Sequence, residues 1–380
     1  MDFKSLKFLT KRRIEAVIFL IIFFGMFSYI GNIMGLPNML NTIMQTSYHL
    51  LMETVLYIMG ITVLSGALGK LLTEFGVVRL IEVGLKPLMK PLYNLPGVAA
   101  LGGILTFLSD NPAIISLAKD KNFSQYFKKY QLISLTNFGT AFGMGLVVII
   151  FMAGRGFASA AMVGLAGAVI GSLISTRIMQ RMILKSYPEL NVSDDNEGDE
   201  QSICFKSEGS IFLRVLNSVL DGGKTGVDLG LAIIPGVLII STFVMMLTFG
   251  PSEAGFTGSA YEGIAILPHL AGKIGFVFEW LFGFTSPELI AFPMTSLGAV
   301  GAALGLVPKF QEAGLIDANA IAVFTAMGMC WSGYLSTHTA MLDSLGYRKL
   351  TGKAIIAHTI GGLFAGISAH WLFVLFSLFV

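Results

Sequence analysis

The chain has 380 residues, of which 54% are hydrophobic and only 13% are charged. A soluble domain carries about 25% charged residues, so this composition excludes an ordinary soluble protein and indicates one that crosses a membrane several times. The net charge of +2 and the two cysteines give no indication of a nucleic-acid partner or of a disulfide framework.

The first half of the chain contains four apolar segments with about the twenty residues that a bilayer-spanning helix needs. The first segment is too long for a cleavable signal and lacks a small-residue cleavage site, so we expect it to remain as an anchor. Residues 36–49 are mixed in polarity and are expected at the interface. Residues 77–93 place charges among apolar residues at the spacing of an amphipathic interfacial helix. The four predicted spans are residues 14–34, 50–72, 130–152 and 157–179.

Residues 95–120 interrupt this series with two apolar arms around the polar tip Ser109-Asp110-Asn111-Pro112. Each arm is too short to span a bilayer. Pro112 has no backbone N–H and disfavours helix at Asn111, which predicts a break between the arms. We therefore expect a re-entrant helical hairpin, whose backbone must be covered by protein or by a water-filled cavity. Asp110 would lie at membrane depth, where an ionisable residue indicates function.

Residues 182–210 are polar, acidic and without apolar periodicity, which predicts a solvated cytoplasmic linker. The second half then begins with residues 211–221, which are expected at the interface. Residues 269–308 repeat the pattern of the first hairpin, with two short apolar arms around the tip Thr285-Ser286-Pro287-Glu288. The spans predicted in this half are residues 227–249, 318–340 and 353–379.

The charges between the spans indicate the orientation of the chain. With the N-terminus in the cytoplasm and both hairpins returning to their side of entry, all but three of the 25 lysines and arginines fall on the cytoplasmic side. This is the bias that the positive-inside rule requires. We expect a multi-pass protein of a bacterial-type plasma (inner) membrane, embedded in the lipid bilayer with its C-terminus outside.

Each half thus has the order span, hairpin, span, span. Because three spans are an odd number, the second half must be inverted relative to the first, an arrangement typical of secondary transporters. The predicted fold class is an all-α polytopic membrane protein with about seven transmembrane helices and two re-entrant hairpins in an inverted repeat. The predicted parts are an anchor and interfacial segment (1–49), a first repeat (50–181), the linker (182–210) and a second repeat (211–380).

The spans that follow the two hairpins are also interrupted, by polar residues and glycines at 136–140 and 332–339. Helix breaks there would free carbonyls for a cation and direct helix N-termini at a polar group. We expect the two tips and the two breaks to converge on a small polar solute, with Na⁺ or H⁺ as the coupling ion and no other cofactor. The candidate solute-binding residues are Asp110, Asn111, Ser286, Glu288, Ser332, Ser336, Thr337 and His338. The candidate cation-coupling residues are Asn111, Thr136, Asn137 and Thr140.

Other roles remain open for these side chains. Asp110 could cap a half-helix, and the hydroxyls could bond to their own helices. His338 is either a proton site or an ordinary hydrogen-bonding residue. Interfacial or inter-helix roles are expected for the lone acids in or near apolar segments. The chain has no phosphate-binding loop, zinc spacing or hydrolase motif, so neither ATP drive nor an enzyme is indicated. The lone acids for which interfacial or inter-helix roles are expected are Glu15, Glu53, Asp228 and Glu279.

Over residues 50–380 these motifs resemble the nucleoside-recognition or gate-domain membrane proteins and, more distantly, the concentrative nucleoside transporters. Ser109-Asp110-Asn111-Pro112 stands where the transporters have a Thr-Glu-Ala-Pro tip, and Pro287-Glu288-Leu289 stands where they have Asn-Glu-Phe. The stretch from Cys330 to Thr339 is similar to their Cys-Gly-Phe-Ala-Asn-Phe-Ser-Ser sequence.

The resemblance implies that hairpins and broken helices form a mobile domain that slides against a scaffold, which is an elevator mechanism. It implies a cation near the first tip, solute contacts by Asp110 and Glu288 in place of two glutamates, and contacts by Ser336 and Thr337 in place of paired serines. It also implies a homo-oligomer, either a dimer or a trimer.

The Gln and Thr that read the base in those transporters correspond here to Leu108 and Ser109, their hairpin Asn corresponds to Pro287, and their broken-helix Asn corresponds to Tyr334. A site loses affinity strongly when such hydrogen-bonding partners are missing. A nucleoside-like solute is therefore the first expectation, with amino acids and small peptides open. The alternative is a non-transporting gate-domain protein that scaffolds or signals, as in spore maturation.

Overall fold

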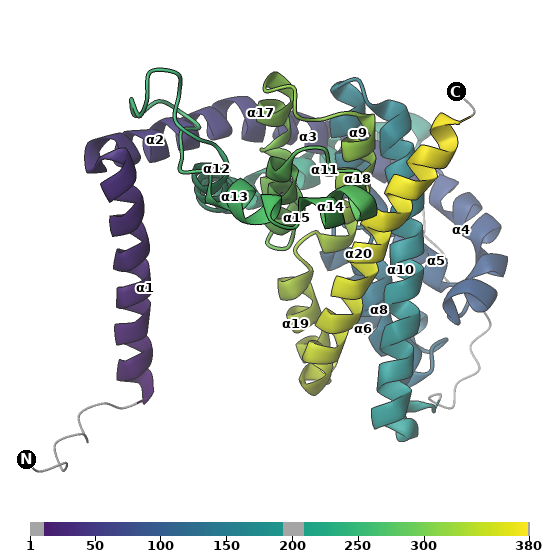
Figure 1. The fold of residues 1–380 in the computed structure, drawn as a ribbon. Helices are drawn as coiled ribbons and strands as arrows, with labels where there is room; N and C mark the ends of the chain where they lie inside the picture. Colours follow the sequence, from purple (N-terminus) through teal and green to yellow (C-terminus); the bar gives the residue numbers. More distant parts are fainter. Residues whose placement is uncertain (1–10, 193–208, 379–380) are drawn as a thin grey trace, which may run out of the picture.

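Helices make up nearly all regular structure in residues 11–192 and 209–378, which are the residues that the computed structural model describes (Figure 1). Most of the predicted linker lies outside the described residues, as do the first ten residues and the last two. Within these described ranges, six helical segments are long and apolar enough to cross a membrane, so the chain is a multi-pass membrane protein. The six segments are Lys11–Met34, Leu36–Glu74, Lys129–Gly154, Ala158–Ser186, Ile211–Thr248 and Arg348–Ser377.

The predicted span 318–340 is divided into two separate helices, which is why six segments are found among the described residues where about seven transmembrane helices were expected. α18 (Ala318–Trp331) ends before Ser332, and α19 (Tyr334–Ser344) begins after Gly333. Neither part alone has the length of a span. The sequence pattern had already placed polar residues and a glycine at this break.

Two segments predicted as separate interfacial elements are continuous with spans. α2 (Leu36–His49) passes through the π-helical turn Leu50–Val55 into α3 (Leu56–Glu74). The predicted interfacial residues 211–221 belong to α11 (Ile211–Ala232), the first part of a helical segment of 38 residues. At 1.5 Å per residue that segment is about 57 Å long, nearly twice the hydrocarbon thickness of a bilayer. It is therefore tilted or extends beyond the hydrocarbon.

α1 (Lys11–Met34) stands apart from the body of the molecule, and α10 (Ala158–Ser186) and α20 (Thr351–Ser377) run side by side through that body (Figure 1). The other helices of the first half are α4 (Val77–Leu88), α5 (Ala99–Leu108), α6 (Pro112–Lys119), α7 (Lys121–Ser124), α8 (Lys129–Thr140) and α9 (Gly145–Gly154). Those of the second half are α12 (Thr242–Thr248), α13 (Ile266–Gly272), α14 (Gly275–Phe282), α15 (Ala291–Ser296), α16 (Val300–Leu304) and α17 (Val307–Glu312). Short 3-10 or π segments cover Met89–Tyr93, Pro188–Leu190, Gly236–Ser241, Pro287–Ile290 and Arg348–Leu350.

Small residues let α10, α18 and α20 form the centre of the body. A Cβ on Gly171 of α10 would lie 2.6 Å from the carbonyl oxygen of Gly361 on α20, so the two backbones are in direct contact. A Cβ on Gly164 would lie 2.5 Å from the carbonyl oxygen of Ala322 on α18. Small residues allow such close approach between membrane helices. This bundle holds the broken segment α18–α19 in place.

A second glycine contact joins α3 to α11. Gly66 of α3 faces Gly222 of α11, and each leaves no room for a Cβ on the other. Gly226 lies against the backbone of Thr62, whose hydroxyl donates a hydrogen bond of 2.7 Å to the Gly226 carbonyl oxygen. The two helices therefore form a tightly packed pair that lines one side of the site described below.

This contact predicts opposite effects of alanine at two positions of α11. Gly226→Ala is expected to lower the free energy of unfolding by about 1–3 kcal/mol, the usual cost of overpacking. Gly223→Ala is the matched control, because its Cβ would meet only Val63 Cγ1 at 3.7 Å; it should be neutral or stabilising, since alanine favours helix by up to about 1 kcal/mol. Thermal unfolding in detergent measures both, and equal melting temperatures would refute the contact.

Candidate functional site

The first tip is present where Pro112 predicts it. α5 ends at Leu108 and α6 begins at Pro112, and the two helices contact each other. Between them, Ser109 donates a 2.6 Å hydrogen bond to the carbonyl oxygen of Leu105. Asp110 has a buried carboxylate oxygen, Oδ1, with no hydrogen-bond partner among the described residues. An unpaired buried carboxylate is costly, so this atom is ready for a proton, a cation or a donor group.

Two helix breaks lie in the segments that follow. The first covers residues 141–144 between α8 and α9, directly after the predicted 136–140, and Met144 there has a φ of 53°. The left-handed conformation is uncommon for a bulky side chain. The second break is at Ser332 and Gly333, where Gly333 has a φ of 58°. Gly333 adopts this conformation without strain because it has no Cβ, whereas a strained position such as Met144 is held by surrounding structure, and such positions concentrate at functional sites.

Asn111 connects the first tip to both breaks. Its side-chain Nδ2 donates a hydrogen bond of 2.5 Å to the carbonyl oxygen of Ser332. Its side chain also rests on the first break, because a Cβ on Gly143 would lie 3.0 Å from Asn111 Cγ and 3.1 Å from Ser332 Cβ. Only glycine fits at this point. The tip and the two breaks, distant in sequence, thus meet around one buried amide.

The second tip lies about ten residues after its predicted place, so that part of the prediction is corrected. Ser286 and Glu288 form a hydrogen bond with each other in a 3-10 turn that packs against α13, and neither lines the cavities described here. Pro287 begins this turn, a position that suits proline, instead of separating two arms. The interruption that faces the site is residues 297–299, between α15 and α16. A Cβ on Gly333 would lie 3.6 Å from the Gly298 carbonyl oxygen.

A cavity of about 310 Å³ lies where these elements converge. It is lined by the first tip, by Met144 of the first break, by Ala299 beside the second tip and by the second break with the start of α19. Of the predicted solute-binding residues, it brings together Asp110, Asn111, Ser332, Ser336 and Thr337.

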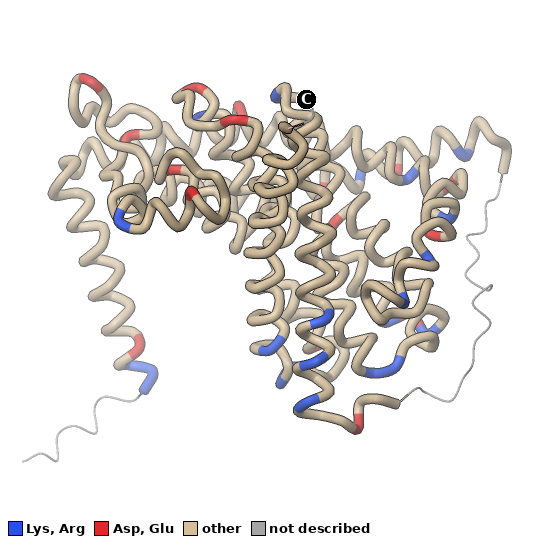
Figure 2. Tube along the Cα trace, turned by 45° about the vertical axis from the view of Figure 1, so that its right-hand side comes forward, with Lys and Arg blue, Asp and Glu red and all other residues tan. Residues whose placement is uncertain are grey.

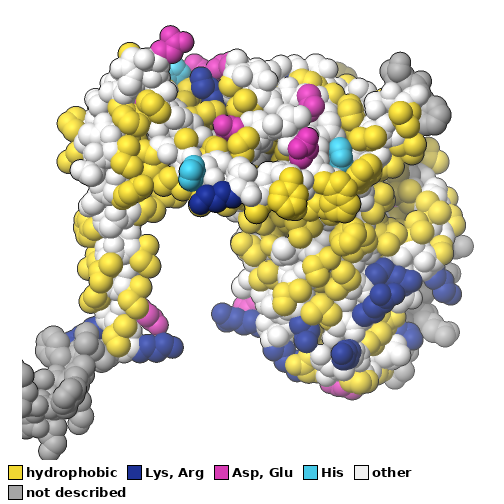
Figure 3. Space-filling view, in the orientation of Figure 1, with side chains coloured by type: hydrophobic (Ala, Val, Ile, Leu, Met, Phe, Trp, Pro, Cys, Tyr) yellow, Lys and Arg dark blue, Asp and Glu magenta, His cyan; other side chains and the backbone are white. Residues whose placement is uncertain are grey.

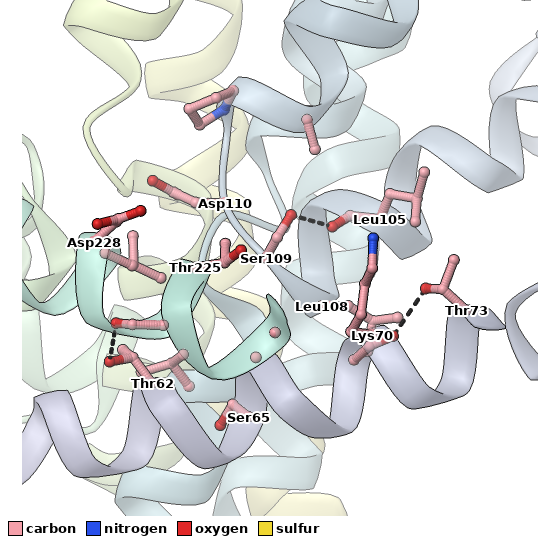
Figure 4. Close-up of a pocket in the computed structure, with 18 of the residues that line it drawn as sticks. Thr62, Ser65, Lys70, Thr73, Leu105, Leu108, Ser109, Asp110, Thr225 and Asp228 are labelled. Carbon is pink, nitrogen blue, oxygen red and sulfur yellow. Dashed lines mark hydrogen bonds between the residues drawn. The ribbon is translucent and has the colours of Figure 1, made fainter. Parts of the chain in front are cut away.

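A second cavity, of about 540 Å³, extends from Asp110 between the hairpin and the α3–α11 pair (Figure 4). It shares Asp110, Pro112, Leu229 and Ala232 with the first cavity, so Asp110 stands between the two. Sequence reasoning assigned Asp228 an interfacial or inter-helix role, but the structure places it in this lining. The signal that could have found it is its position near the middle of the helical segment 211–248, which appeared to begin only at residue 227.

The predicted cation-coupling residues of α8 are buried but do not line either cavity. Asn137 Nδ2 donates hydrogen bonds of 3.0 Å to Ser175 Oγ and to the carbonyl oxygen of Ala354, so it links α8 to α10 and α20. The hydroxyls of Thr136 and Thr140 have no partner among the described residues. Their contact with a cation stays a prediction.

His338 is fully buried and lies beside His358, with the ring centroids 4.6 Å apart. Neither ring nitrogen of His338 has a hydrogen-bond partner among the described residues, and it lines neither cavity. Its contact with the solute is therefore not part of the observed arrangement. His358 was not singled out from the sequence, because nothing in its flanking residues marks it.

His358 provides a hydrogen-bond partner for a backbone carbonyl next to the second break. α18 ends at Trp331, so the Cys330 carbonyl lies in a last turn where helical partners run out. His358 Nε2 lies 2.5 Å from that oxygen and Nδ1 lies 3.1 Å from Ser175 Oγ. A carbonyl oxygen can only accept, so Nε2–H of His358 donates to the Cys330 carbonyl. In the neutral ring Nδ1 is then an acceptor, and it accepts from the Ser175 hydroxyl, which itself accepts from Asn137.

His358→Ala is expected to lower the free energy of unfolding by about 1–3 kcal/mol, because it leaves the buried Cys330 carbonyl without this partner and the Ser175 O–H without an acceptor. His269→Ala is the control, since His269 is exposed. Thermal unfolding in detergent should separate the two variants. A melting temperature of His358→Ala equal to that of the control would contradict the assigned network.

The comparisons with known proteins agree with this geometry. Residues 55–156 match the family model described as Gate, nucleoside recognition. This region is a nucleoside-recognition gate domain. It runs from the start of α3 to the end of α9 and therefore contains the first tip and the first break. No curated protein matches the chain by sequence.

Solved structures of the concentrative nucleoside transporter CNTnw share the fold. Its inward-facing, substrate-bound structure is 13% identical, covers 84% of this chain and 76% of that chain, and gives a TM-score of 0.51. A variant in its intermediate 1 state is 13% identical with coverages of 94% and 85% and a TM-score of 0.52. A variant in an outward-facing state is 12% identical with coverages of 85% and 76% and a TM-score of 0.52. At these identities the likeness shows the fold alone.

Proposed function

We propose that this protein is a secondary active transporter of a small polar solute, coupled to Na⁺ or H⁺. A nucleoside-like solute is the first candidate, and amino acids and small peptides are the next. The observation that carries the proposal is that the first tip contacts both helix breaks through Asn111. This contact lies next to a cavity and beside Asp110, whose buried Oδ1 has no partner among the described residues. Broken helices that converge inside a membrane protein are the usual construction of a transporter site.

The arrangement of the two halves supports an inverted repeat. α8 and α19 lie toward one end of the body, and α9 and α18 lie toward the other (Figure 1). The series α8, break, α9, α10 therefore has its counterpart in α18, break, α19, α20, traversed in the opposite direction. The helix pairs α5–α6 and α15–α16 then take the parts of two re-entrant hairpins.

An elevator motion is the mechanism that fits this repeat. The hairpins and broken helices would form the moving part, and the glycine-packed pair α3–α11 would belong to the scaffold on the other side of the larger cavity. CNTnw, which has the same fold, has structures titled inward-facing, intermediate and outward-facing. We propose that this protein likewise alternates between inward-facing, intermediate and outward-facing states.

The distribution of charge supports the proposed orientation. A group of lysines and arginines lies at the end of the body where α10 ends and α20 begins, others lie higher along one flank, and the acidic residues lie mainly toward the opposite end (Figure 2). Apolar side chains cover α1 and the sides of the body between these ends (Figure 3). The basic end is the cytoplasmic one by the positive-inside rule, which puts the start of α1 inside and the end of α20 outside. The exposed apolar face of α1 fits lipid or a neighbouring copy in a dimer or trimer.

Coupling follows from the unpaired carboxylate. A desolvated carboxylate is stabilised by a proton, a cation or a charge-assisted hydrogen bond. A coupling ion at Asp110 would remove the cost of leaving it unpaired while a neutral solute occupies the cavity. Asp110 and Asn111 are the proposed contacts at the tip, and Ser332, Ser336 and Thr337 are those at the second break.

A thermal-shift screen of the purified protein tests the proposal. Nucleosides, nucleobases, amino acids and dipeptides are added in Na⁺ or K⁺ buffers at two pH values, because a ligand that binds only the folded state raises the melting temperature. We expect a solute whose shift needs Na⁺ or acid and disappears in Asp110→Asn. No shift with any solute or ion, together with unchanged behaviour of Asp110→Asn, would favour the non-transporting scaffold.

A further inference from the structure

Asp228 is the one acidic residue that the α3–α11 pair contributes to the larger cavity. It lies on the α11 face that also presents Thr225, Leu229 and Ala232 to the cavity, at spacings of three to four residues that keep them on one side of the helix. No hydrogen bond or ion pair of Asp228 occurs among the described residues. Its carboxylate and that of Asp110 face the same space from opposite walls (Figure 4).

The charges of this lining do not balance. Asp110, Asp228 and Lys70 are its ionisable residues, and the other polar side chains are threonine and serine hydroxyls. Two carboxylates and one ammonium leave a net charge of −1. Asp228 and Lys70 are exposed side chains, so this excess is not buried; a cleft lined by an excess of one sign of charge concentrates ligands of the opposite sign.

Asp110 Oδ1 supplies the second, independent indication of a ligand. It is enclosed, it has no partner among the described residues, and it belongs to a residue of the cavity lining. A neutral solute would leave this negative charge to the coupling ion, whereas one protonated amine would itself neutralise it and donate up to three hydrogen bonds. The volume of about 540 Å³ is within the range of small-molecule sites.

We infer that the solute carries a protonated amine, which binds between Asp110 of the first tip and Asp228 of α11. The inference rests on the proposed transport function and names the chemical class of its solute. Asp228 lies outside residues 55–156, so the amine joins the gate domain to a helix that the domain does not include. Discrimination between an amine and a neutral isostere then depends on Asp228.

Matched pairs of probes test this on the purified full-length chain in detergent, by thermal shift and isothermal titration. The pairs are 5′-amino-5′-deoxyadenosine with adenosine, and 4-aminobutan-1-ol with butane-1,4-diol. We expect the amine of at least one pair to bind at least tenfold more tightly than its neutral partner. Asp228→Asn should weaken that amine at least tenfold, and Asp228→Glu should restore most of the affinity. Asp221→Asn is the control, because Asp221 is exposed on the same helix and does not line the cavity.

The outcomes separate the two proposals. If a neutral solute binds as well as its amine, and binding depends on Asp110 but not on Asp228, the transporter proposal stands and this inference is overturned. The inference also falls if Na⁺ alone gives a shift that depends on Asp228 while the amines give none. If no solute and no ion binds, both proposals fail. Size-exclusion profiles of each variant show whether a loss of binding comes from misfolding.

Discussion

Replacing Asp110 by asparagine is expected to weaken solute binding strongly and at the same time to stabilise the ligand-free protein. The asparagine has nearly the same shape but no charge, so it replaces an enclosed carboxylate oxygen that has no partner among the described residues by a neutral amide atom, which costs less to leave unpaired. The stability gain should be a part of the cost of one unsatisfied buried group, which is about 1–3 kcal/mol. A lost hydrogen bond to a charged group is worth about 1.5–3 kcal/mol, which is a loss of binding of about ten- to more than a hundredfold.

The control for this variant is Asp120→Asn at the other end of α6. Asp120 is exposed, and its side chain accepts a 2.9 Å hydrogen bond from the Asn122 backbone, which an asparagine oxygen can also accept. It should leave both melting temperature and binding unchanged. The measurements are thermal unfolding without ligand and titration with any solute found in the screen. An Asp110→Asn protein that binds normally would remove Asp110 from the site.

Gly143→Ala is expected to reduce solute binding at least tenfold, although it adds only one methyl group. The new Cβ would collide with the Asn111 side chain and with Ser332 Cβ. The tip and the first break must then separate, and the hydrogen bond from Asn111 to the Ser332 carbonyl is lost or distorted. A shift of about 1 Å in a binding site is enough for large losses.

Two further variants isolate this mechanism. Gly60→Ala on α3 is the control, because no atom lies within 4 Å of its added Cβ. Asn111→Ala combined with Gly143→Ala should recover part of the stability that Gly143→Ala loses, because the closer collision, with the Asn111 side chain, is gone, but it should not recover binding. Such coupling is what residues in contact show in a double-mutant cycle. Strictly additive effects on stability would contradict the contact.

The first tip and the second break could be read from the sequence because their signals are local. Pro112 follows a polar tip between two short apolar arms, and Ser332 and Gly333 interrupt an apolar segment. The second tip could not, because no charge lies near Gly298 and the nearest proline, Pro293, lies within α15 and not at the tip. The more conspicuous Pro287 and Glu288 match the expected pattern but form a 3-10 turn elsewhere.

The other differences come from tertiary packing. Asp228 gains its position from the contact of α3 with α11, which depends on glycines that face one another across a long sequence separation. His358 caps the carbonyl of Cys330 only because the break in α18–α19 lies beside α20. In both cases the neighbouring sequence gives no sign of a special role. The surroundings of the side chain depend on contacts between helices that are far apart in the sequence.

The central claim is that the cavity at the first tip opens in turn to the two sides of the membrane. The most direct measurement labels Ser336→Cys, in a Cys204→Ser background, with a membrane-impermeant maleimide applied separately to right-side-out and inside-out vesicles. Ser336 is exposed and lines the cavity, and Cys330 is buried. The account predicts labelling in both preparations. Labelling in only one, under all ionic conditions, would contradict alternating access.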